Sequence, residues 1–72
     1  MPKLYASSAI VKILLRNGFV LVSQKGSHAK FKKESATVLT VIVPVAKKEI
    51  PYGTYRSILR QSKLSEEDFK NQ

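Results

Sequence analysis

The chain has 72 residues, no cysteine, one histidine and a formal net charge of +8 at pH 7. This length predicts a single domain, residues 1–72, because so short a chain buries only roughly 60% of its unfolded surface and can build only one small core. The lack of cysteine excludes a disulfide framework and a thiolate site, and it favours a reducing, cytoplasmic setting. The apolar runs are too short to cross a bilayer, so no membrane association is expected.

The charge is unevenly distributed along the chain. Residues 1–65 hold twelve basic and two acidic residues, and the other acids, Glu66, Glu67 and Asp68, stand together near the end. A surface of this sign attracts polyanions, most commonly nucleic acid. Charge alone leaves open a ribosome-associated protein or a structural DNA-binding protein. Ser65 and Asp68 have the spacing of a helix capping box, which explains the acid cluster without a catalytic role.

The first predicted element is a helix over residues 8–17, where apolar residues recur at helical spacing. Ser7 or Ser8 is the expected N-cap, and Gly18 marks the end of the helix. Residues 19–24 are rich in β-branched and aromatic side chains and predict the first strand.

Two further strands are predicted after a Lys-Gly-Ser turn. The second covers residues 28–33, and the third and most strongly β-forming covers residues 37–43 and stops at Pro44. A loop then leads to a second helix over residues 54–62, with Thr54 as its candidate cap, and to a last helical turn at 65–69.

This order of elements predicts an α+β fold in which both helices cover one face of a three-stranded antiparallel sheet. Side chains two apart on a strand point the same way. His28, Lys30 and Lys32 therefore share one face, and Ala29 and Phe31 share the other. Because the apolar pair belongs in the core, the histidine and the lysines are expected on the open face.

Residue counts exclude several kinds of chemistry. With one histidine, no cysteine and no carboxylate pair outside the capped turn, zinc and two-metal sites lack ligands, so no metal or cofactor is expected. The three glycines are isolated, so no phosphate-binding loop is predicted. What remains is proton transfer by His28 beside lysines, the minimum for cleaving RNA through its own 2′-hydroxyl. The alternative is that His28 is a plain surface or turn residue.

Two stretches, "NGFVLVSQKGSHAKFKK" and "TVIVPVAKKEIPYGTYRSILRQSKLSEEDF", resemble the HicA family of bacterial toxins, which cleave RNA and are paired with an antitoxin. The resemblance runs from Ser8 to Phe69, and its most specific parts are the Gly-Ser-His at residues 26–28, the "TVIVP" strand and the C-terminal segment. It implies a fold like that of a double-stranded-RNA-binding domain (dsRBD), in the order α-β-β-β-α. It also implies metal-independent cleavage of mRNA, with His28 as the essential residue, and a HicB-type antitoxin as partner.

The residues around His28 complete the expected site. The turn glycine presents the histidine, and the lysines hold phosphate. The expected RNA contacts are Lys25, Gly26, Ser27, Lys30, Lys32, Lys47 and Lys48. The chain departs from the family pattern at Ala29 and at Ala46-Lys47, where members often carry further histidines. A single histidine must then serve as base and afterwards as acid, or pass one proton to water. The antitoxin is expected to cover His28 and the lysine face with an acidic or RNA-like surface.

A non-catalytic double-stranded-RNA-binding module is the alternative function. Such modules share the helix, sheet, helix order and carry lysines at the start of the last helix, near the place of Lys47 and Lys48. Against this reading, Ile50, Pro51 and Tyr52 occupy the place where that lysine-rich helix start is expected.

Overall fold

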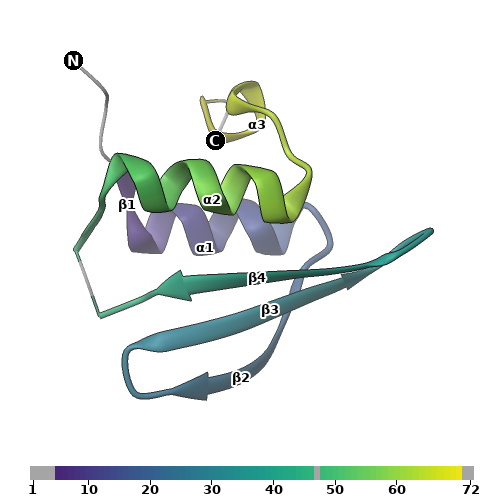
Figure 1. Cartoon of the computed structure of the whole chain (residues 1–72), viewed down its shortest axis with the longest axis horizontal. Coiled ribbons are helices and arrows are strands. Elements are labelled where there is room, and N and C mark those ends of the chain that lie inside the picture. Colours follow the sequence, from purple (N-terminus) through teal and green to yellow (C-terminus); the bar gives the residue numbers. More distant parts are fainter. Residues whose placement is uncertain (1–4, 47, 71–72) are drawn as a thin grey trace.

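Three antiparallel strands in the order β2-β3-β4 form the main sheet (Figure 1). A computed structural model describes residues 5–46 and 48–70 of the chain. Its elements, in chain order, are β1 (Tyr5–Ala6), α1 (Ser7–Arg16), β2 (Val20–Lys25), β3 (His28–Glu34), β4 (Val38–Pro44), β5 (Glu49–Ile50), α2 (Tyr52–Ser62) and α3 (Glu66–Lys70).

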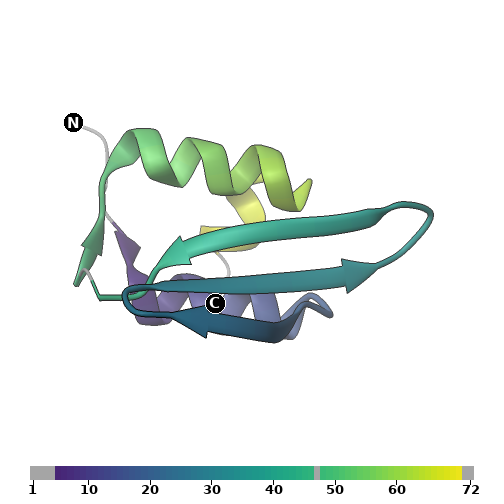
Figure 2. The same ribbon diagram turned by 60° about the horizontal axis from the view of Figure 1, so that its bottom comes forward.

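The two long helices cover the same face of the sheet. In Figure 1 both α1 and α2 lie on one side of the strands, and Figure 2, turned by 60°, shows the other side of the sheet uncovered. The expected α+β architecture is therefore confirmed, with the α-β-β-β-α layout of a dsRBD-like fold.

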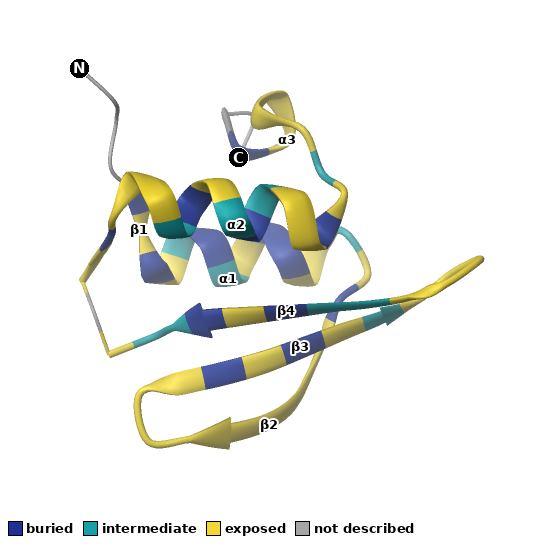
Figure 3. Cartoon of the chain, viewed as in Figure 1, coloured by how far each residue is buried: buried dark blue, intermediate teal, exposed yellow. Residues whose placement is uncertain are grey.

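Burial along β3 alternates as the sequence predicted (Figure 3). Ala29 and Phe31 are each 2% exposed, whereas His28, Lys30 and Lys32 are exposed on the open face. The side chains that pack beneath the helices form one core, which comprises Tyr5, Ile10, Ile13, Leu14, Phe19, Ala29, Phe31, Val41, Val43, Ile50, Tyr55, Ile58 and Phe69.

The C-terminus of α1 is a Schellman motif. Gly18, at φ 92°, donates its N–H to the Leu15 carbonyl, and Phe19 donates to the Leu14 carbonyl. This conformation suits glycine because it lacks a Cβ atom. The turn places the Phe19 ring in the core, at 1% exposure, and directs the chain into β2.

The start of α1 differs from the prediction of a serine cap. The helix begins at Ser7, its N-cap is Ala6, and no side chain caps it. The Ser7 N–H instead donates to the Lys48 carbonyl, beside the short antiparallel pair in which Tyr5 and Ala6 of β1 face Ile50 and Glu49 of β5. A backbone carbonyl from a distant segment thus satisfies the N–H of the first helical residue, which has no partner within the helix.

The predicted start of the second helix was also wrong. α2 begins at Tyr52, its N-cap is Pro51, and Thr54 lies inside it without acting as a cap. The fixed φ of proline is compatible with a helix start, and the Pro51 carbonyl accepts the first helical hydrogen bond, from Tyr55 N–H at 2.9 Å. The segment expected to be a loop therefore holds β5 and the first turn of α2.

The capping box before α3 is confirmed. The Asp68 carboxylate accepts hydrogen bonds from the Ser65 N–H, at 2.9 Å, and from the Ser65 hydroxyl, and the Ser65 hydroxyl accepts one from the Asp68 N–H. α3 buries Phe69 completely, with its ring edge-on to Tyr55. Asp68 is thus accounted for by helix capping, and Glu66 lies 3.6 Å from Arg56 on α2.

Strand β2 is the free edge of the sheet. It is exposed along its length, and Val20, Leu21 and Val22 are between 47% and 57% exposed. The other edge, β4, lies against α2, where Gln61 Oε1 accepts a 3.2 Å hydrogen bond from the Ile42 N–H. No helix in the described part of the chain is long and apolar enough to span a membrane.

Candidate functional site

His28 is the first residue of β3 and follows the tight turn that joins β2 to β3. Only Gly26 and Ser27 separate the strands, and the φ of 56° at Gly26 suits the first position of a type II′ hairpin turn. Lys25 pairs with His28 on one side, and Pro44 pairs with it on the other. The histidine is therefore held at one end of the central strand by neighbours on both sides.

The turn also orients the imidazole. Ser27 Oγ lies 3.2 Å from His28 Nδ1, and the Ser27 carbonyl accepts a hydrogen bond from the Ala46 N–H at 3.4 Å. The His28 side chain is exposed. With Nδ1 engaged by the serine, Nε2 is the ring nitrogen left to exchange a proton with a bound substrate.

Two hollows in the surface meet at His28. The first, which we call the lysine hollow, measures about 420 Å³ and carries two ammonium groups beside the imidazole. It is lined by Ser23, Lys25, His28, Ala29, Lys30 and Ile42. Positive charge next to a proton-transfer group suits the binding and stabilisation of a phosphate.

The second hollow, which we call the helix hollow, lies where the end of β4 meets α2 and measures about 300 Å³. It is lined by His28, Ile42, Pro44, Thr54, Ser57 and Gln61. Among the described residues that line it, His28 is the one titratable side chain, and the others are neutral. The same imidazole therefore borders a cationic hollow and a neutral one.

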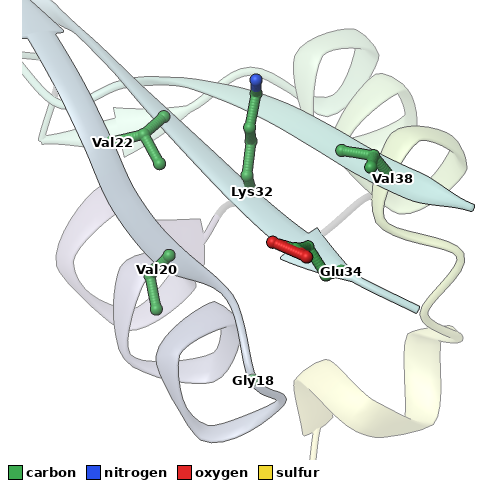
Figure 4. Close-up of a pocket in the computed structure, with 6 residues that line it drawn as sticks. All are labelled: Gly18, Val20, Val22, Lys32, Glu34 and Val38. Atoms are coloured by element: carbon green, nitrogen blue, oxygen red, sulfur yellow. The ribbon is translucent and has the colours of Figure 1, made fainter.

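Lys32 lies on the same face of the sheet but borders a different depression. This groove, of about 460 Å³, is lined by Gly18, Val20, Val22, Lys32, Glu34 and Val38 (Figure 4). Its lining includes three valines and a carboxylate, so it offers less net positive charge than the lysine hollow.

Of the two remaining predicted lysines, the structure describes Lys48, which does not line either hollow at His28. Lys48 is exposed and borders a separate hollow beside the start of α1, with Ser7, Ser8 and Glu49 among its other lining residues. Lys47 lies outside the described residues. The structure thus groups Lys25, Gly26, Ser27, His28 and Lys30, and it places Lys32 and Lys48 elsewhere on the surface.

The helix hollow contains polar residues of α2 that were not among the predicted site residues. Thr54, Ser57 and Gln61 follow one another at i, i+3 and i+7, which places them on one face of α2. That polar spacing is the signal in the sequence that could have found them. It does not reveal that this face lies beside His28, which is far away along the chain.

Potential metal ligands are sparse around this site. Across residues 5–46 and 48–70, no three or more His, Cys, Asp or Glu side chains form a group that could hold a metal ion.

Comparison with protein families bears directly on this arrangement. The family model described as the HicA toxin of bacterial toxin-antitoxin systems matches residues 7–64. The chain belongs to the HicA toxin family. The match covers α1, the three-stranded sheet and α2, and it includes both hollows and the Gly-Ser-His turn. Membership in the HicA family makes the chain the toxin of a toxin-antitoxin system and implies an antitoxin partner. No curated protein matches the chain.

Proposed function

We propose that this HicA-family toxin is a metal-independent endoribonuclease that cleaves single-stranded mRNA in the cytoplasm, with His28 as its general acid–base group. The observation that carries the proposal is the placement of the chain's single imidazole. It is exposed, it has Ser27 at Nδ1, and it shares a hollow with Lys25 and Lys30. This combination supplies a proton-transfer group and a cationic phosphate site at one point.

The reaction uses a nucleophile that RNA itself provides. The 2′-oxygen attacks the adjacent phosphorus, its proton passes to His28 Nε2, and the bond from phosphorus to the 5′-oxygen breaks. The leaving 5′-oxygen takes a proton from the imidazolium or from water. The products are a 2′,3′-cyclic phosphate and a 5′-hydroxyl, and Lys25 and Lys30 stabilise the negative charge that develops on the phosphate oxygens.

The remaining predicted contacts extend the RNA path. Gly26 and Ser27 bring backbone groups next to the phosphate at His28. Lys32 and Lys48 are exposed and contact phosphates further along the strand. Lys47 belongs to the same proposed set. These contacts add affinity without sequence preference.

The start of α2 weighs against a non-catalytic double-stranded-RNA-binding module. Lys48 precedes β5, and the helix begins with Tyr52, Gly53 and Thr54 instead of lysines. A helix start that binds duplex phosphates would carry positive charge in this turn. Two lysines, Lys25 and Lys30, lie instead beside His28 in the lysine hollow.

The antitoxin in this proposal is a HicB-type protein that presents an acidic or RNA-like surface to His28 and the lysine hollow. A surface of complementary charge would bind quickly and exclude RNA from the site. Co-expression of such a partner should therefore relieve the growth inhibition that the toxin alone causes.

The test is cleavage of a labelled single-stranded RNA by the purified protein, with and without EDTA, followed by analysis of the product ends. We expect equal cleavage in both conditions and products with a 2′,3′-cyclic phosphate. Activity that EDTA abolishes and one divalent ion restores would contradict metal independence. Binding of duplex RNA without any cleavage would favour the non-catalytic module.

A further inference from the structure

We propose that the helix hollow is a nucleotide subsite, in which Thr54, Ser57 and Gln61 bind the base or ribose next to the phosphate that is cleaved. This inference rests on the proposed function, because it assigns the subsite to an RNA held at His28. It adds a source of nucleotide preference, which contacts between lysines and phosphates do not provide.

The position of the helix hollow follows from the residues it shares with the lysine hollow. His28 and Ile42 line both. A phosphate bound by Lys25 and Lys30 beside His28 therefore has its neighbouring nucleotide at the mouth of the helix hollow. The volume of about 300 Å³ lies at the small end of ligand pockets, which suits one nucleotide unit rather than a longer segment.

The chemistry of the lining separates the roles of the two hollows. The lysine hollow carries ammonium groups, which attract phosphate. The helix hollow, apart from His28, combines neutral polar groups from α2 with the apolar surfaces of Ile42 and Pro44. Apolar contacts to a base face, with hydrogen bonds to base edges and to the 2′-hydroxyl, are how proteins recognise single-stranded RNA.

The polar groups of α2 keep hydrogen-bonding capacity for a ligand. Gln61 Oε1 accepts the Ile42 N–H, and within the described part of the chain the Gln61 amide nitrogen has no partner, so its N–H donors are available. The Ser57 hydroxyl donates to the Gly53 carbonyl at 3.3 Å, which leaves its oxygen free to accept. The bond from Ile42 also holds α2 at the edge of β4, so the subsite is pre-formed.

The subsite can be tested through binding, independently of cleavage. Thr54→Val and Ser57→Ala would each be introduced into the His28→Ala protein, and the affinity for an eight-nucleotide single-stranded RNA would be measured. Sequencing the bound fraction of a randomised eight-nucleotide pool would report base preference. We expect each hydroxyl removed to weaken binding roughly three- to tenfold, the range of a single net hydrogen bond, and the base preference to flatten.

Three further variants control for folding and for remote effects. Thr37→Val makes the same chemical change at the far end of the sheet, in the exposed turn between β3 and β4, and should leave binding unchanged. Thr54→Ser retains the hydroxyl and should bind like its parent. Gln61→Glu retains an oxygen acceptor for the Ile42 N–H but replaces the N–H donors, so it should change which bases are enriched. Circular dichroism establishes that each variant is folded.

The outcomes separate this inference from the proposed function. Unchanged affinity and unchanged base enrichment in folded Thr54→Val, Ser57→Ala and Gln61→Glu proteins would overturn the subsite, even if the wild-type protein cleaves RNA. A wild-type protein that does not cleave RNA, combined with variants that lose binding as expected, would refute the nuclease and support a nucleotide subsite beside a phosphate that is bound at His28 but not cleaved.

Discussion

Ser27 Oγ lies 3.2 Å from Nδ1 of His28, so the residue that completes the β2–β3 turn also engages the imidazole that begins β3. The same serine accepts a hydrogen bond on its carbonyl from the Ala46 N–H, which joins the turn to the segment after β4. Ser27 therefore links the backbone position of His28 to the orientation of its ring.

Replacing Ser27 with alanine should lower cleavage without a comparable loss of RNA affinity. The hydroxyl holds Nδ1, and its loss frees the ring to rotate away from the scissile phosphate. A net hydrogen bond contributes about 1 kcal/mol, so kcat should fall roughly five- to tenfold while KM changes little. Ser27→Thr keeps the hydroxyl and should restore most of the activity. A Ser27→Ala protein with wild-type kcat would show that Ser27 does not position the histidine.

His28→Ala should separate catalysis from binding. A general acid–base group contributes typically 10²- to 10⁴-fold in rate, whereas one lysine that contacts phosphate changes the salt dependence of binding by a slope of about 1. Lys30→Ala is the matched comparison, because both side chains lie exposed on β3 and line the lysine hollow. Rate, affinity at several salt concentrations and melting temperature should be measured for both.

Melting should change little in either variant, since neither side chain belongs to the core. Wild-type cleavage by His28→Ala, or a loss of cleavage caused only by unfolding, would remove the histidine from the mechanism.

Gly18→Ala and Gly53→Ala should shift stability in opposite directions. At Gly18, with φ at 92°, a Cβ would adopt a backbone conformation unfavourable for L-residues and would meet the Lys33 side chain at 3.4 Å, so about 1–2 kcal/mol should be lost. Gly53 lies in the first turn of α2 with nothing within 4 Å of an added Cβ, so alanine should stabilise by up to about 1 kcal/mol. Urea unfolding measures both, and equal effects would contradict the assignment of the Schellman motif.

Tyr55→Phe should reduce the sensitivity of the fold to alkaline pH. Burial of the phenol, followed by the proximity of Tyr5, raises the pKa of Tyr55 above its ordinary value of 10.0. The folded state therefore favours the protonated phenol, and this contribution to the free energy of unfolding is fully present below about pH 10. It is lost as pH rises further, by at most about 1.4 kcal/mol per pH unit.

Thermal melting of the wild type and Tyr55→Phe between pH 8 and 11.5 checks this prediction. Lysine deprotonation affects both proteins alike, so the difference between the two curves isolates the phenol. If the melting temperatures of the two proteins change in parallel across that range, ionisation of Tyr55 does not destabilise the folded state.

Local sequence patterns determined much of the sheet and of the helix ends. The alternation along residues 28–32 assigned His28 and the lysines to the open face because successive strand residues point to opposite sides. Two helix boundaries were predicted correctly, at Gly18 and at the pair Ser65 and Asp68. The hydrogen bonds that form these helix ends involve only groups a few residues away in the sequence. The family resemblance, carried by motifs close to His28, was confirmed by the match over residues 7–64.

Only the tertiary structure decided which distant segments meet. The pairing of β1 with β5 involves strands of two residues, too short for any periodic signal, and the backbone bond beside it, from Ser7 N–H to the Lys48 carbonyl, was not predicted. The apolar residues of β2 predicted a strand, but their exposure follows from its place at the free edge of the sheet. His28 meets Thr54, Ser57 and Gln61 because α2 packs against β4, and that contact depends on how whole elements bury their apolar faces, which no local pattern encodes.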